Sequence, residues 1–275
     1  MLISRPRIHS CFAVGLVLAA SLISSAGGAE HSTSTAQQLP SANAAFHLGL
    51  TAIRSGKTLE ALSALQDAAE QGHTLAQWRL AVLYEQGSGV EQSDAKAFRY
   101  YQLIASQNSE ESADGPLAPI IADSFVKLGA YYQAGVAGSN IAPQPERAFN
   151  LWNHAATYYG DPRAQYALAK LYLTGQGIQR NPRRAVQWLF VAARKHNVAA
   201  QCELGRILLT GAPGVKALPA TGRMWLEIAR RKATTSDQQW IIDAHTAGFA
   251  GLSDAERERA ITMADQWLKQ EVATH

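Results

Sequence analysis

The stretch AQYALAKLYLTGQG, at residues 164–177, decides the fold because copies of it recur along the chain. The copies are AQWRLAVLYEQGSG at residues 76–89, AQCELGRILLTG at 200–211 and the more divergent SFVKLGAYYQAG at 124–135. Each copy carries apolar residues four and eight positions after its first residue, and a glycine eleven positions after it. This spacing predicts a helix with one buried stripe that ends at a glycine in the left-handed conformation.

A second helical pattern follows each copy. These patterns begin with a small residue, carry a leucine or aromatic residue near their middle and end in small residues: AFRYYQLIA from residue 97, AFNLWNHAA from 148, AVQWLFVAA from 185 and GRMWLEIA from 222. The unit is therefore a helix–turn–helix of about 36 residues, which must stack on its neighbours to bury its apolar faces. We predict an all-α fold, a right-handed α/α solenoid of about five such repeats over residues 44–232.

Residues at the ends of the predicted helices support these boundaries. Asp161 and Asn181 each precede a proline and are predicted N-caps. After the solenoid, one helical pattern starts near Thr235 and another at Ser253, with Glu256 three residues later as in a capping box. We expect residues 233–275 to form helices that cap the C-terminal end of the solenoid.

The N-terminus has the pattern of a secretory signal peptide. Two arginines precede thirteen apolar residues at positions 11–23, and small residues follow. Thirteen residues are too few for the ~20 that a membrane-spanning helix needs. We predict a signal peptide at residues 1–29, cleaved after Ala29 or after Ala26, then a flexible segment at 30–43. The exported chain keeps Cys202 as its one cysteine, which excludes an internal disulfide and cysteine-type metal sites.

Charge is distributed unevenly along a chain whose formal net charge is only +3. Residues 85–123 contain seven acidic and two basic residues, whereas residues 180–232 contain eleven basic and two acidic ones. One interpretation is a solvated surface, and the other is attraction toward a partner of complementary charge. Nucleic acid does not fit an exported protein, while anionic lipid or polysaccharide stays open.

Catalytic and cofactor motifs are missing from the sequence. It contains no HExxH, GxSxG, phosphate-binding Walker loop or CxxC pattern, and its histidines do not stand at metal-ligand spacing. Glycine pairs such as GSG and GQG stand where predicted helices end, which favours a turn over a phosphate site. We therefore predict no enzymatic activity, no cofactor and no metal.

Two sets of residues are the candidate functional positions. First helices of stacked pairs line the concave face of such a solenoid, which makes six residues candidate partner contacts: Trp78, Glu85, Gln133, Tyr166, Lys170 and Arg206. The acidic stretch at residues 107–119 interrupts the solenoid and is either a tolerated insertion or a site of proteolysis. Its candidate residues are Glu110, Glu111 and Asp114.

The repeat resembles the Sel-one-like repeat family, a relative of the tetratricopeptide repeat with a longer internal loop. Residues 164–195, AQYALAKLYLTGQGIQRNPRRAVQWLFVAARK, carry this resemblance most clearly, and it extends over about residues 44–232. The first pair, at residues 45–72, has a shorter connection and looks like a plain tetratricopeptide unit. The resemblance implies a protein-binding solenoid.

The whole layout is also similar to rhizobial negative regulators of exopolysaccharide production. The shared features are the signal peptide, the break SQNSEESADGPLAPIIAD, the run AATYYGDPRAQ and the C-terminal LSDAERERAITMADQWL. This resemblance implies a periplasmic protein that binds the sensor part of a membrane histidine kinase and inhibits it, until acid-triggered proteolysis relieves the inhibition. The alternatives are a general periplasmic scaffold for envelope assembly or secretion and, less favoured, a cell-wall hydrolase.

Overall fold

The computed structural model describes residues 40–108, 110–234 and 238–273. The predicted signal peptide and most of the segment at 30–43 lie outside these residues. The described part of the chain forms twelve helices. Its β-structure is limited to an isolated antiparallel bridge between Ala212 and Val215. No helix in the described part is long and apolar enough to cross a membrane.

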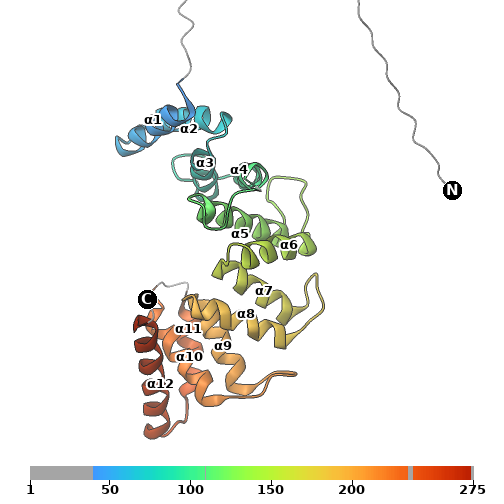
Figure 1. Cartoon of the computed structure of the whole chain (residues 1–275), viewed down its shortest axis with the longest axis vertical. Coiled ribbons are helices and arrows are strands. Elements are labelled where there is room, and N and C mark those ends of the chain that lie inside the picture. Colours follow the sequence, from blue (N-terminus) through green and yellow to red (C-terminus); the bar gives the residue numbers. More distant parts are fainter. Residues whose placement is uncertain (1–39, 109, 235–237, 274–275) are drawn as a thin grey trace, which may run out of the picture. The chain divides into compact units, whose positions relative to one another are not determined.

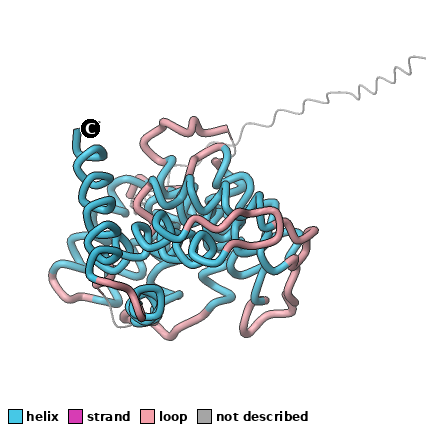
Figure 2. Tube along the Cα trace, turned by 90° about the horizontal axis from the view of Figure 1, so that it is seen from below, coloured by secondary structure: helices cyan, strands magenta, loops and turns pink. Residues whose placement is uncertain are grey.

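Ten of the helices form five pairs of consecutive helices along the chain (Figure 1). Each helix contacts its partner within the pair, and each second helix contacts the first helix of the next pair. The bounds are α1 Ala42–Arg54 and α2 Thr58–Glu70; α3 Thr74–Gln86 and α4 Asp94–Gln107; α5 Ala118–Ala134 and α6 Pro145–Thr157; α7 Pro162–Thr174 and α8 Pro182–Arg194; α9 Val198–Thr210 and α10 Pro219–Lys232. The predicted α/α solenoid of five pairs is confirmed, and its loops lie at the helix ends (Figure 2).

The predicted helix caps are present. The Asp161 side chain accepts hydrogen bonds from the first backbone N–H groups of α7, and Asn181 accepts one from Arg184 N. Such bonds satisfy donors that have no partner inside the helix. Gly175 ends α7 with φ 77°, the left-handed conformation that glycine adopts without steric cost. His73 is an additional cap, because its Nδ1 accepts from Ala76 N at 3.2 Å.

A buried glutamine explains the recurring dipeptide Ala-Gln of the repeat. Three glutamines have at most 2% of their surface exposed. Each donates from Nε2 to a backbone carbonyl near the end of the preceding second helix: Gln77 to Ala69 (3.1 Å), Gln165 to Ala156 (3.2 Å) and Gln201 to Ala193 (3.0 Å). The amide therefore joins consecutive pairs at three of the four junctions. In α5 the equivalent position holds Phe125, whose ring packs 4.6 Å from that of His154.

Small residues allow close packing within each pair. The alanines that open the second-helix patterns, Ala97, Ala148 and Ala185, are fully buried. The fifth pair has Gly222 at this position, where a Cβ atom would lie 2.7 Å from Leu209 N and 2.8 Å from Gly205 O. Alanine does not fit this close crossing of α9 and α10, which explains the departure from the repeat pattern.

Two further helices, α11 (Gln239–Phe249) and α12 (Asp254–Ala273), pack on α10. The capping box is confirmed: Ser253 N donates to Glu256 Oε2 at 3.0 Å, and Glu256 N donates to Ser253 Oγ at 3.4 Å. Thr235 lies outside the described residues, and α11 begins at Gln239.

A buried carboxylate connects this C-terminal cap to the solenoid. Glu227 of α10 is 3% exposed and accepts hydrogen bonds from Arg230 and Arg231. His245 Nε2 of α11 lies 2.8 Å from Glu227 Oε2, and Arg231 also pairs with Asp265 of α12 at 2.5 Å. Burial by itself would raise the pKa of Glu227, but the two arginines outweigh it and lower that pKa to about 2.

Candidate partner-binding face

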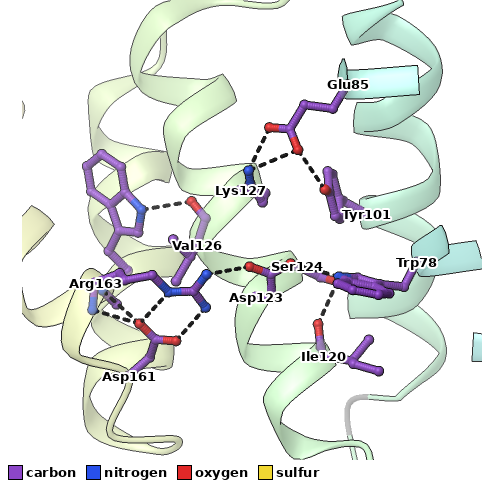
Figure 3. Close-up of polar contacts among 12 residues, drawn as sticks. Trp78, Glu85, Tyr101, Ile120, Asp123, Ser124, Val126, Lys127, Asp161 and Arg163 are labelled. Atoms are coloured by element: carbon purple, nitrogen blue, oxygen red, sulfur yellow. Dashed lines mark hydrogen bonds and ion pairs between the residues drawn. The ribbon is translucent and has the colours of Figure 1, made fainter. Parts of the chain in front are cut away.

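A chain of polar contacts runs across the first helices of three consecutive pairs (Figure 3). Trp78 on α3 donates from Nε1 to Asp123 Oδ2 on α5 at 2.8 Å. The other oxygen of Asp123 pairs with Arg163 Nη1 on α7 at 2.6 Å. Arg163 also pairs with Asp161, the N-cap of its own helix, at 2.7 Å. One carboxylate, Asp123, thus connects the second, third and fourth pairs.

A second bridge joins α3 to α5 beside the first. Lys127 Nζ lies 2.7 Å and 2.9 Å from the two carboxylate oxygens of Glu85. The hydroxyl of Tyr101, on α4, donates to Glu85 Oε2 at 3.0 Å. Burial and the nearby Glu85 carboxylate raise the pKa of Tyr101, which keeps this hydroxyl protonated as a donor. The two bridges together hold the second pair against the third.

Two of the six predicted contact residues belong to these bridges. Trp78 and Glu85 stand seven residues apart on α3, about two helical turns, and both are half-buried. Their polar atoms are engaged inside the chain, so their observed contacts are structural. Sequence reasoning missed three residues of these bridges: Asp123, which accepts from Trp78; Lys127, which pairs with Glu85; and Arg163, which pairs with Asp123. A signal existed for one pair, because Asp123 and Arg163 carry opposite charges at the same position of neighbouring repeats.

Three other predicted residues lie close together on α7 and α9. Tyr166 is half-buried, and burial together with the nearby Glu203 raises its pKa to about 12. Lys170 Nζ lies 5.9 Å from the centre of the Tyr166 ring. Arg206 pairs with Glu203 at 3.0 Å. Lys170 and Arg206 are exposed, so both cations are accessible to a partner.

The sixth predicted residue, Gln133, lies near the end of α5. Its Nε2 donates to Gln176 Oε1, in the loop that follows α7, at 2.9 Å. Gln133 is half-buried and connects the third pair to the fourth. The accessible part of the predicted face is therefore the group around Tyr166, and we define the α7–α9 patch as Tyr166, Lys170 and Arg206.

The predicted proteolysis site lies in the loop between α4 and α5. Glu110 and Asp114 are exposed, and Glu111 is half-buried. The loop contacts the third pair, because the hydroxyl of Tyr158, just after α6, donates to the carbonyl oxygen of Glu111 at 3.3 Å. The Tyr158 hydrogen bond thus attaches this acidic segment to the third pair.

The described residues include no group of three or more histidine, cysteine and acidic side chains that could hold a metal ion. Cys202 is a buried free thiol whose pKa burial raises to about 12. A thiol with so high a pKa is protonated at neutral pH and therefore a poor nucleophile. The polar clusters of the first helices connect repeats and supply surface charge.

The repeats match a known family. The pattern of the Sel1 repeat fits residues 74–109, 126–157, 162–197 and 198–233, which cover half of the chain. The chain belongs to the Sel1 repeat family. The matched segments contain the second, fourth and fifth helical pairs in full and the third pair from Val126 onward. Residues 164–177, whose sequence recurs along the chain, lie in the third matched segment.

Two relatives are similar over most of their length. The chain is 30% identical over 218 residues to an exopolysaccharide production negative regulator of Rhizobium leguminosarum bv. viciae, covering 79% of each chain. It is 29% identical over 220 residues to the protein of the same description from Rhizobium meliloti (strain 1021), covering 80% of each. The predicted resemblance to the rhizobial regulators is confirmed.

A solved structure supports the fold. The crystal structure of c5321, a protective antigen of uropathogenic Escherichia coli strains with an SLR fold, superimposes with a TM-score of 0.65 at 24% identity. The superposition covers 83% of this chain and 45% of that one. At this identity the likeness concerns the fold alone.

Proposed function

We propose that this Sel1 repeat protein is an exported negative regulator of exopolysaccharide production that acts by binding another protein. The similarity to two rhizobial regulators over about four fifths of the chain carries the proposal. The solenoid is consistent with it, because stacked helical repeats offer extended surfaces for proteins. The polar clusters described above are used in contacts between repeats, which favours a binding role over a catalytic one.

The partner in this proposal is the periplasmic sensor domain of a membrane histidine kinase, which the protein holds in the inactive state. The α7–α9 patch is the part of the first-helix face that a partner reaches, because Lys170 and Arg206 are exposed. Two cations beside an aromatic ring suit an acidic surface on the sensor domain. We place the contact there, in preference to Trp78 and Glu85, whose polar atoms are occupied.

A direct binding assay tests this proposal. The mature chain, from Glu30, is titrated with the purified periplasmic domain of the host's envelope sensor kinase at neutral and mildly acidic pH. Saturable binding is expected, and the double variant Lys170→Glu/Arg206→Glu should weaken it at least about tenfold. The control variant Arg54→Glu/Lys269→Glu changes the net charge equally at exposed sites on α1 and α12 and should bind as the wild type does. No binding at either pH contradicts the kinase as partner.

A genetic test addresses the regulatory part separately. Deleting the gene should raise exopolysaccharide output, and the wild-type gene should restore it while the Lys170→Glu/Arg206→Glu variant should not. Unchanged output, with several envelope proteins recovered by crosslinking, would instead support a general periplasmic scaffold.

A further inference from the structure

The second helices carry a different surface, centred on α8, that the proposed function does not use. Two hollows flank this helix and share Val191. One, of about 370 Å³, is lined by Asn153, Tyr172, Arg184, Gln187, Trp188 and Val191. The other, of about 460 Å³, is lined by Phe190, Val191, Arg194, Lys195 and His196. We refer to the two hollows together as the α8 groove.

The centre of the α8 groove is apolar. Phe190 and Val191 are 41% and 39% exposed, although both are large hydrophobic side chains on a helix that also has a buried face. The Phe190 ring meets that of Trp225 on α10 edge to face, with centroids 6.3 Å apart. Phe190 is therefore held in place from the next pair. Exposed apolar residues grouped beside hollows are typical of binding surfaces.

The rim of the α8 groove is cationic. Arg184, Arg194 and Lys195 surround the apolar centre, and α8 contains no acidic residue. The acidic residue of the adjacent α10, Glu227, is buried and bound by its own arginines, so it does not offset this charge. Arg194 makes no ion pair with any other residue that the structure describes, and its side chain is exposed.

Contacts within the chain hold two of these cations in position. The Nζ of Lys195 donates to the carbonyl oxygen of Gly160 at 2.6 Å, and Nη1 of Arg184 donates to the Tyr172 hydroxyl at 3.3 Å. Neither bond neutralises a charge, because the acceptors are uncharged. The basic excess of residues 180–232, evident in the sequence, is thus gathered in part around an apolar groove.

We propose that the α8 groove binds an acidic segment of a partner protein that places a bulky apolar side chain against Phe190 and Val191. This inference rests on the proposed protein-binding function, but it places the contact on the second helices and not on the first helices. Charge complementarity selects the acid, and the exposed apolar centre selects the bulky side chain. A membrane is a poorer occupant, because the Phe190 ring is packed on Trp225 on one side, and an anionic polysaccharide supplies no apolar group.

Selection from short random peptides displayed on phage tests this inference without a known partner. Peptides selected on the mature chain should be rich in aspartate and glutamate and carry a leucine, isoleucine or aromatic residue. The variants Val191→Glu and Arg194→Glu should each lower the affinity for a selected fluorescent peptide at least about tenfold, as measured by an anisotropy titration. The control variant Arg54→Glu/Lys269→Glu should not. Circular dichroism and the Tm establish that each variant is folded.

Three results would overturn the inference: no enriched peptides, enriched peptides without acidic residues, or equal binding to the groove variants and the wild type. Phosphatidylglycerol vesicles and alginate are titrated in parallel, and groove-dependent binding of either, without peptide binding, would assign the surface to that ligand instead. Peptide binding at the groove together with no kinase-domain binding would contradict only the kinase partner. Kinase-domain binding that the groove variants leave unchanged, with no peptide selected, would contradict only the α8 groove.

Discussion

Gln165 donates from its side-chain Nε2 to the carbonyl oxygen of Ala156 at 3.2 Å, from the start of one helical pair to the end of the pair before it. Ala156 lies in the last turn of α6, where carbonyl groups have no partner in their own helix. The glutamine thus satisfies a buried acceptor and sets the distance between two repeats. The same bond recurs from Gln77 and from Gln201.

Replacing Gln165 by leucine should lower the free energy of unfolding by about 1–3 kcal/mol, because it leaves the Ala156 carbonyl without this donor. Gln201→Leu should cost less, since the carbonyl of Ala193 also accepts from His196 N at 3.1 Å. Urea denaturation measures the free energy of unfolding of both variants. Gln187→Ala, on the exposed side of α8, is the control and should leave that free energy nearly unchanged. Equal losses at Gln165 and Gln201 would contradict this account.

Gly222→Ala should destabilise the fifth pair by about 1–3 kcal/mol, because its new methyl group meets the backbone of α9. Gly248→Ala is the matched comparison. There the methyl group would meet Leu226 Cδ1 at 2.5 Å, a side-chain atom that yields more readily than the backbone does. Thermal unfolding should therefore show a larger drop in Tm for Gly222→Ala, and the reverse order would refute the argument from close helix crossing.

The lowered pKa of Glu227 predicts acid sensitivity. A glutamate whose pKa is about 2 in the folded chain and about 4.5 unfolded stabilises the fold above pH 4.5, and this contribution disappears as the pH falls toward 2. The contribution at neutral pH is on the order of 3 kcal/mol. Glu227→Gln should lower stability at pH 7 and flatten the decline in acid, as measured by urea unfolding over a pH series. If the stability of the variant falls with pH in parallel with that of the wild type, Glu227 does not cause the decline.

Trp78→Phe separates a structural role from a binding role. Phenylalanine keeps an aromatic ring but loses the N–H that Asp123 accepts, so stability should fall by about 1–2 kcal/mol. Binding of the sensor domain should stay unchanged, whereas Lys170→Glu/Arg206→Glu should weaken binding and leave stability nearly unaltered, because exposed pairs contribute little. Isothermal titration and chemical denaturation on both variants test the contrast. Loss of binding in folded Trp78→Phe would restore Trp78 as a contact residue.

Limited digestion with a glutamate-specific protease tests the predicted cleavage loop. The first cut should follow Glu110 or Glu111, because Glu110 is exposed in the loop between α4 and α5, although the Tyr158 hydroxyl restrains this loop. Tyr158→Phe removes that bond and should accelerate the cut severalfold, as followed by mass spectrometry. A first cut in α12, for example after Glu258, would contradict the assignment.

The number and pairing of the helices follow from local signals, and for that reason they were predictable. Apolar spacing, N-caps such as Asp161 and the capping box at Ser253 act within a few residues of one another. The bridges of Asp123 and Glu85 were missed, because long side chains meet across repeats only when the rotation of each helix is known. The same limit applies to Trp78, where repeat geometry indicates a face but not which neighbour occupies its N–H.

The junction between the second and third pairs is built differently from the other three. Where they have a buried glutamine, this one has Phe125, and it depends on Glu85–Lys127 and on the Asp123 contacts at partly exposed positions. Salt screens charges at such positions, but it has little effect on the buried hydrogen bond of a glutamine amide. Ionic strength therefore weakens the polar contacts of this junction, whereas the rings of Phe98 and Tyr101 on α4, which pack against Tyr131 and Tyr132 on α5, still hold the two pairs together.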